Sequence, residues 1–72
     1  MEKVKIRGDY IELGQFLKLI NLFMTGGEAK IYITENEILV NGEIESRRGR
    51  KLRVNDIVKV DNREFQIIDD NK

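Results

Sequence analysis

Hydrophobic and polar residues alternate at the start of the chain and then change to a helical spacing. Residues 3–7 alternate between basic and apolar side chains, which is typical of a short β-strand. Apolar residues then recur at i, i+3, i+4 and i+7, namely Leu13, Phe16, Leu17 and Ile20. This spacing predicts an amphipathic helix that ends near residues 21–23. Asp9-x-x-Glu12 precedes it and resembles a capping box, with Asp9 as the N-cap.

A second capping box, Thr25-Gly26-Gly27-Glu28, predicts the start of a second short helix. In this motif the Thr25 side chain accepts a hydrogen bond from the backbone N–H of Glu28, and Glu28 accepts one from that of Thr25. The residues expected on the buried face of this helix are Ala29, Tyr32 and Ile33. Asn36 is placed to end the helix in a left-handed conformation.

From residue 37 onward the pattern is typical of β-strands joined by short turns. Asn41-Gly42 separates residues 38–40 from residues 43–44 and predicts a β-hairpin. Asn55-Asp56 and Asp61-Asn62 are further turns, on either side of an apolar strand at residues 57–60. Phe65 and Ile67 alternate with polar residues in a last strand. The first strand could close the sheet by pairing with a C-terminal one, although the sequence does not fix this pairing.

These elements predict one domain, residues 1–72, of the α+β class. Two short helices are expected to pack on a small, mainly antiparallel sheet of about five strands.

The composition excludes several kinds of chemistry. There is no Cys and no His in the 72 residues, so disulfides and thiolate or imidazole metal sites are impossible. A nucleophile would have to be Ser46, Thr25, Thr34, a lysine or a carboxylate, and neighbouring carboxylates such as Glu35 and Glu37 are typical of a solvated surface. We therefore predict that the protein is not an enzyme and uses no cofactor, metal or small-molecule substrate.

The N-terminus lacks the apolar run of a signal peptide, and no apolar run approaches the length that spans a membrane. We therefore expect a cytoplasmic protein with no membrane partner.

Positive charge is concentrated in one segment, although 13 Lys+Arg balance 13 Asp+Glu over the chain. Residues 47–53 read Arg-Arg-Gly-Arg-Lys-Leu-Arg and hold no acidic residue. Guanidinium groups bind phosphate in a bidentate manner and stack on bases. The alternative is a solvated charge run balanced by Glu43 and Glu45 across the hairpin, but ordinary surfaces alternate in sign. We interpret the run as a nucleic-acid interface made by Arg47, Arg48, Arg50, Lys51 and Arg53.

The start of the second predicted helix is a weaker candidate for phosphate binding. Gly26 and Gly27 would leave backbone N–H groups accessible at the helix N-terminus. The alternative is that these glycines serve backbone shape or close packing, and Glu28 would repel a phosphate there. Lys30 lies on the helix face opposite its apolar stripe and could border the same surface. Because aromatic residues are few, we expect recognition of phosphate backbone and shape, with little reading of sequence.

Several segments together resemble the S4 RNA-binding domain family over roughly residues 10–60. They are Leu13-x-x-Phe16-Leu17-Lys18-Leu19, Thr25-Gly26-Gly27-Glu28-Ala29-Lys30, Ile38-x-Val40-Asn41-Gly42-Glu43 and Asn55-Asp56-Ile57-Val58. The resemblance is strongest with the small, single-domain S4-like proteins of bacteria, in which an Arg-rich run follows the hairpin. It implies the αL motif of that family, in which the second helix and the adjacent hairpin form the binding surface.

The resemblance implies binding of structured RNA of the ribosomal or transfer RNA class, or of a ribosomal particle. Carried over by position, the implied surface is Thr25, Gly26, Gly27, Lys30, Asn41 and Gly42, beside the basic run. The chain departs from the family pattern at Gly26, where many members have Arg, and at Asn55, where the family has Gly. Asn tolerates the same left-handed backbone, whereas the missing Arg leaves more of the affinity to the basic run.

The sequence therefore predicts a non-enzymatic RNA-binding module. Two alternatives remain open. The protein could be an adaptor that binds another protein through a sheet edge and the Arg-rich patch, or it could bind DNA, because phosphate contacts do not distinguish the two polymers.

Overall fold

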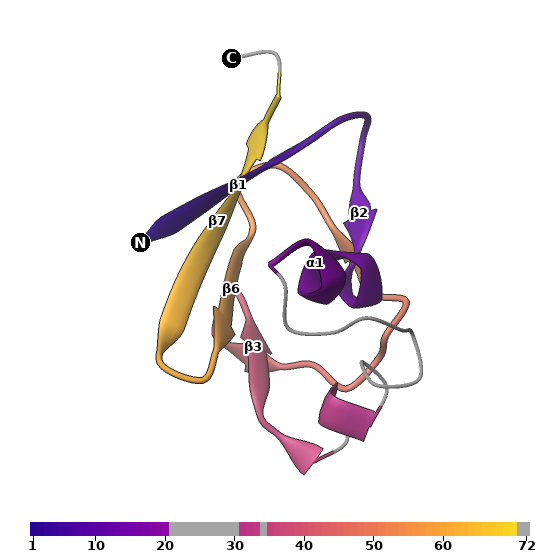
Figure 1. Cartoon of the computed structure of the whole chain (residues 1–72), viewed down its shortest axis with the longest axis vertical. Coiled ribbons are helices and arrows are strands. Elements are labelled where there is room, and N and C mark those ends of the chain that lie inside the picture. Colours follow the sequence, from indigo (N-terminus) through magenta and orange to yellow (C-terminus); the bar gives the residue numbers. More distant parts are fainter. Residues whose placement is uncertain (21–30, 34, 71–72) are drawn as a thin grey trace.

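A five-stranded sheet with the spatial order β1-β7-β6-β3-β4 organises the molecule. The computed structural model describes residues 1–20, 31–33 and 35–70. In chain order, the strands and the helix are β1 (Glu2–Ile6), β2 (Ile11–Glu12), α1 (Leu13–Leu19), β3 (Ile38–Val40), β4 (Glu43–Ile44), β5 (Lys51–Leu52), β6 (Ile57–Val60) and β7 (Arg63–Asp69). Figure 1 shows α1 lying beside the sheet, next to β2. The predicted α+β class, with a small and mainly antiparallel sheet, is confirmed.

Short turns with left-handed residues connect the antiparallel strands as the sequence predicts. Asn41 (φ 53°) and Gly42 (φ 85°) join β3 to β4, and Val40 pairs with Glu43 across this turn. Asp61 (φ 55°) lies in the turn between β6 and β7. Asparagine, aspartate and glycine are the residues that adopt positive φ at least cost, which explains why these turns could be read from the sequence.

The first strand pairs with the last one at an edge of the sheet, a pairing that the sequence left open. β1 runs parallel to β7, with Val4 opposite Ile67, whereas the pairs β6–β7, β3–β6 and β3–β4 are antiparallel. Arg63 at the start of β7 donates two hydrogen bonds to the Glu2 carboxylate, at 2.6 and 2.8 Å, and so links the beginnings of the two strands.

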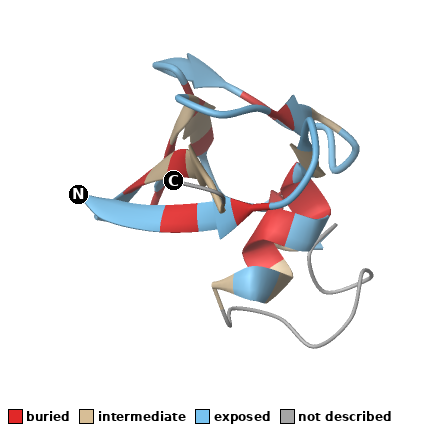
Figure 2. Ribbon diagram, turned by 90° about the horizontal axis from the view of Figure 1, so that it is seen from above, coloured by how far each residue is buried: buried red, intermediate tan, exposed pale blue. Residues whose placement is uncertain are grey.

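The core lies between α1 and one face of the sheet. The predicted apolar stripe of the helix is buried, with Leu13, Phe16 and Leu17 at 0% exposure and Ile20 packed against the same cluster. The ring of Phe16 meets that of Phe65 on β7 edge to face, with centroids 5.3 Å apart. Figure 2 shows buried residues on α1 and at alternate positions along the strands, which is the pattern of a sheet with one face covered.

Residues 31–33 and 35 are helical, and Ile33 is buried in the same core. This agrees with a second short helix, whose predicted capping box at residues 25–28 lies outside the described residues. Within the part of the chain that the structure describes, no helix is long and apolar enough to cross a membrane.

The capping predictions need correction at both helices. The Asp9 capping box is wrong, because α1 begins at Leu13 with Glu12 in the N-cap position and no side-chain cap. Residues 11–12 instead form β2, which pairs with β5. Asn36 is also not left-handed, since its φ is not positive; its backbone N–H donates to the carbonyl of Tyr32 at 2.9 Å. α1 ends at Leu19, earlier than the predicted residues 21–23.

Candidate nucleic-acid interface

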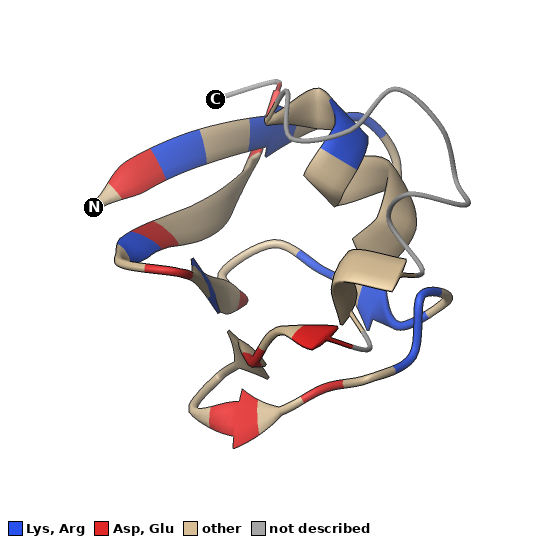
Figure 3. Ribbon diagram, turned by 60° about the horizontal axis from the view of Figure 1, so that its bottom comes forward, with Lys and Arg blue, Asp and Glu red and all other residues tan. Residues whose placement is uncertain are grey.

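The Arg-rich run lies in the segment that connects the edge of the main sheet to the small β2–β5 ribbon. Residues 45–53, here called the basic segment, begin directly after β4 and include β5. Figure 3 shows basic residues following one another along this segment, at the right of the view. The structure therefore brings the five predicted basic residues together on one short stretch of surface, which four sets of contacts hold in place.

The first contact is a buried carboxylate at the base of the segment. The side chain of Glu45 is only 8% exposed, and its Oε2 accepts hydrogen bonds from the backbone N–H groups of Ser46 and Arg47, both at 3.0 Å. The Arg47 guanidinium donates through Nε and Nη2 at 3.0 and 3.2 Å, and Arg50 donates through Nη1 at 2.9 Å. The Glu45 backbone N–H donates to the carbonyl of Ile38 on β3. Glu45 thus ties two arginines to the sheet.

These bonds keep Glu45 charged although it is buried. The hydrogen bond from Arg47 is the largest cause, and it outweighs the opposing effect of burial, so the pKa of Glu45 falls from 4.5 to about 2. The side chain is therefore a carboxylate at neutral pH.

The second contact joins the basic segment to the start of α1. The backbone N–H groups of Leu13 and Gly14 donate to the carbonyls of Arg50 and Arg48, at 2.8 and 2.9 Å. These bonds satisfy helix donors that a capping side chain usually takes, which is why no cap from Asp9 is needed. A Cβ atom at position 14 would lie 2.7 Å from Cγ of Arg48. Gly14 therefore allows the side chain of Arg48 to lie across the first turn of α1.

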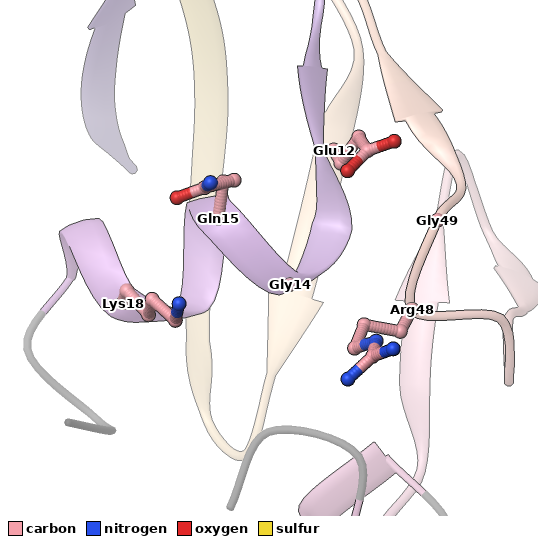
Figure 4. Close-up of a pocket in the computed structure, with 6 residues that line it drawn as sticks. All are labelled: Glu12, Gly14, Gln15, Lys18, Arg48 and Gly49. Carbon is pink, nitrogen blue, oxygen red and sulfur yellow. The ribbon is translucent and has the colours of Figure 1, made fainter. Parts of the chain in front are cut away.

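A polar cleft of about 340 Å³ opens between α1 and the basic segment. Figure 4 shows the residues that line it, Glu12, Gly14, Gln15, Lys18, Arg48 and Gly49. Lys18 lines the cleft from α1 and Arg48 lines it from the basic segment, so the fold places two cations around one hollow. The sequence analysis did not place Lys18 among the site residues, because its position opposite Arg48 depends on how the segment docks.

The third contact is made by Tyr10, which lies before β2. The Nζ atom of Lys51 lies 5.0 Å from the centre of the Tyr10 ring, and Cζ of Arg53 lies 5.8 Å from it. Both distances are within the range of cation–π attraction. Tyr10 is 43% exposed, so it gathers two cations at the surface. The sequence analysis did not assign this role to Tyr10, since forty residues separate it from its partners.

The hairpin turn is connected to the end of the basic segment through Asp56. One carboxylate oxygen of Asp56 accepts a hydrogen bond from the side chain of Asn41 at 3.1 Å, and the other accepts one from the backbone N–H of Arg53 at 2.8 Å. Asn41 also accepts a hydrogen bond from the N–H of Ile57. Asn55 beside this site has φ 79°, so the expected left-handed residue is confirmed. Asn41 therefore lies near the basic segment, and its side chain connects the hairpin turn to Asp56 and Ile57.

The remaining predicted site residues, Thr25, Gly26, Gly27 and Lys30, lie outside the described residues. Among the residues that are described, no group of three or more carboxylates is arranged to hold a metal ion.

Comparison with known proteins gives two matches that cover most of the chain. Residues 4–68 match the model of the S4 domain. The chain is also 46% identical, over 66 residues, to a protein of Bacillus subtilis named as a probable ribosome maturation protein, RlbA. That alignment covers 90% of this chain and 93% of the relative, so the two are similar over nearly their whole lengths.

Proposed function

The chain belongs to the S4 domain family, and from this premise we propose that it is a non-enzymatic module that binds structured RNA. The observation that carries the proposal is the basic segment, in which five cations lie together on a surface that Glu45, α1 and Tyr10 organise. Such a cluster binds a polyanion even when the net charge is zero, because screening limits the effect of distant charges to roughly 10 Å.

In this proposal the ligand is ribosomal RNA or a ribosomal particle, because the similar Bacillus protein carries the name of a ribosome maturation protein. We expect the protein to act there as a single S4 module in the cytoplasm. Arg47, Arg48, Arg50, Lys51 and Arg53 contact backbone phosphates. Thr25, Gly26, Gly27 and Lys30, with Asn41 and Gly42, form the adjoining part of the surface in the manner of the αL motif.

The mechanism is phosphate neutralisation on a preformed surface. Each phosphate contact releases condensed counterions, so the logarithm of the association constant falls linearly with the logarithm of salt concentration. With about four to six contacts, the slope is roughly −3 to −5. Shape complementarity comes from the polar cleft between α1 and the basic segment, which Lys18 and Arg48 line.

The test is a salt titration of RNA binding with a matched pair of variants. Fluorescence anisotropy measures binding to a labelled ribosomal RNA stem-loop. Lys51→Ala/Arg53→Ala removes two cations from the cluster, whereas Lys3→Ala/Lys5→Ala removes two exposed cations from β1. We expect the first variant to bind roughly tenfold more weakly, with a slope shallower by about 2, and the second to bind like the wild type.

An equal effect of the two variants would contradict the proposal, because it would mean that only overall charge matters. Competition with DNA of the same sequence separates an RNA-binding protein from a DNA-binding one. If the wild type binds RNA only weakly and without saturation, while a protein partner binds tightly, the adaptor alternative is supported instead.

A further inference from the structure

We propose that Glu45 is a positioning residue that raises the affinity for RNA, although its charge opposes that of the ligand. This inference rests on the proposed function and adds a role to it. Glu45 is the acidic residue of the basic segment, so simple electrostatics predicts that it weakens binding. The geometry points to the opposite effect.

The contacts of Glu45 are those of a scaffold for the loop. Its carboxylate bonds to the backbone at Ser46 and Arg47 and to the side chains of Arg47 and Arg50. It therefore fixes both the path of the chain and the direction of two guanidinium groups. The two carboxylate oxygens accept from five donors, three at Oε2 and two at Oε1, and the bonds to charged groups are stronger than those between neutral groups.

The arrangement leaves the arginines able to bind phosphate. The Arg47 side chain is 74% exposed although it bonds to Glu45, whereas the Glu45 side chain is 8% exposed. A guanidinium carries more N–H donors than the two that one carboxylate takes here. Glu45 thus binds the inner side of Arg47 and leaves donors toward solvent. Holding a long side chain in place before binding removes the entropy loss that RNA binding would otherwise impose on it.

An inhibitory role would require a different geometry. A carboxylate that competes with phosphate has to lie on the binding surface, where the ligand can displace it. Glu45 is buried at the base of the segment, with its backbone N–H bonded to β3. Displacing it would break backbone contacts of the loop as well as ion pairs.

Two substitutions that remove the same charge separate these possibilities. Glu45→Gln removes the charge from the scaffold and keeps the shape of the side chain. Glu43→Gln removes one negative charge from an exposed position on β4, two residues away. If Glu45 acts only through its charge, both variants bind RNA more tightly. If Glu45 positions the arginines, Glu45→Gln binds roughly fivefold to tenfold more weakly and Glu43→Gln binds equally or slightly more tightly.

The salt dependence supplies a readout that a loss of stability alone would not change. Anisotropy titrations use the labelled ribosomal RNA stem-loop at several salt concentrations and a temperature at which each variant is folded by circular dichroism. In Glu45→Gln, in which the arginines lose the carboxylate that holds them, we expect the slope of log K against log salt to become shallower by about 1. A slope that becomes steeper in Glu45→Gln, together with tighter binding, would overturn the inference.

A measurement on the wild type makes the result independent of how well the variant folds. In the free protein, the Nε–H group of Arg47, which donates to Glu45, is expected to give a distinct NMR signal that exchanges slowly with water. A rapidly exchanging Arg47 signal would overturn the inference. Failure of the proposed function has a different signature, since the wild type itself would then bind no RNA. If the wild type binds and Glu45→Gln binds equally well, only the role of Glu45 is wrong.

Discussion

The pH dependence of stability gives a sharp test of the Glu45 network. Glu45 has a pKa of about 2 in the folded protein, against an ordinary value of 4.5. Because the folded-state value is the lower one, the network stabilises the fold fully above about pH 5, and this contribution is lost as the pH falls from about 4.5 toward 2. Glu45→Gln should therefore lower the free energy of unfolding at neutral pH and matter little in acid.

The expected size follows from the difference between the two pKa values. That difference corresponds to roughly 3 kcal/mol of folding free energy at neutral pH. Water around Arg47, which is 74% exposed, screens part of the interaction, so we expect about 1–3 kcal/mol. A small domain has a total stability of about 5 kcal/mol, which makes this single network a large fraction of it.

Urea unfolding of the wild type and of Glu45→Gln, followed by circular dichroism from pH 7 to pH 3, measures the difference directly. We expect less than about half of the neutral-pH difference to remain at pH 3. Arg63 also lowers the pKa of Glu2, but this effect is common to both proteins and cancels in the comparison. A difference that stays constant with pH would refute the reasoning, because it would show that Glu45 stabilises the fold by packing and not as a carboxylate.

Three other substitutions test the fold and the site. Gly14→Ala improves helix propensity by about 1 kcal/mol but forces the side chain of Arg48 to move. We expect weaker RNA binding by anisotropy, with little change in the free energy of unfolding. Unchanged binding would mean that the position of Arg48 is unimportant. Because φ of Asn55 is 79°, Asn55→Ala should lower the free energy of unfolding by about 1 kcal/mol, whereas Asn55→Gly should leave it nearly unchanged. Equal losses for the two variants in urea unfolding would contradict the backbone argument. Phe16→Leu removes the edge-to-face contact with Phe65 and should lower the free energy of unfolding by roughly 1–2 kcal/mol; no loss would mean that this pair contributes little.

The parts of the fold that could be predicted are those set by local sequence. The hairpin at Asn41-Gly42 follows from two residues that accept positive φ, and the buried face of α1 follows from the spacing of its apolar residues. The alternation in residues 3–7 also predicts a strand, which is β1, whereas its parallel pairing with β7 could not be read from local sequence.

The errors and omissions lie where distant segments meet. The capping box at Asp9 is wrong because carbonyls of Arg48 and Arg50, more than thirty residues later, accept the hydrogen bonds of the first helical N–H groups. The role of Gly14 has the same origin, since only docking of the basic segment shows why a side chain would not fit there.

In the candidate site, the charge could be predicted from the sequence, whereas the geometry could not. The concentration of arginine in residues 47–53 identified the basic segment. The sequence analysis considered Glu45 only in the alternative that it did not adopt, as a charge that balances the run. Its burial and its bonds to Arg47 and Arg50 make it part of the structure of the run. A glutamate two residues before an arginine cluster is the sequence signal that could have indicated this.

The most direct test of the central claim is crosslinking of the tagged protein to RNA in cells, followed by sequencing of the recovered nucleic acid. Wild type, Lys51→Ala/Arg53→Ala and Lys3→Ala/Lys5→Ala are compared at equal protein levels. We expect particular structured RNAs, ribosomal RNA among them, to be recovered with the wild type and with the β1 variant and to be lost with the variant of the basic segment. Equal recovery from all three proteins, or no recovery above background from the wild type, would contradict RNA binding by the basic segment.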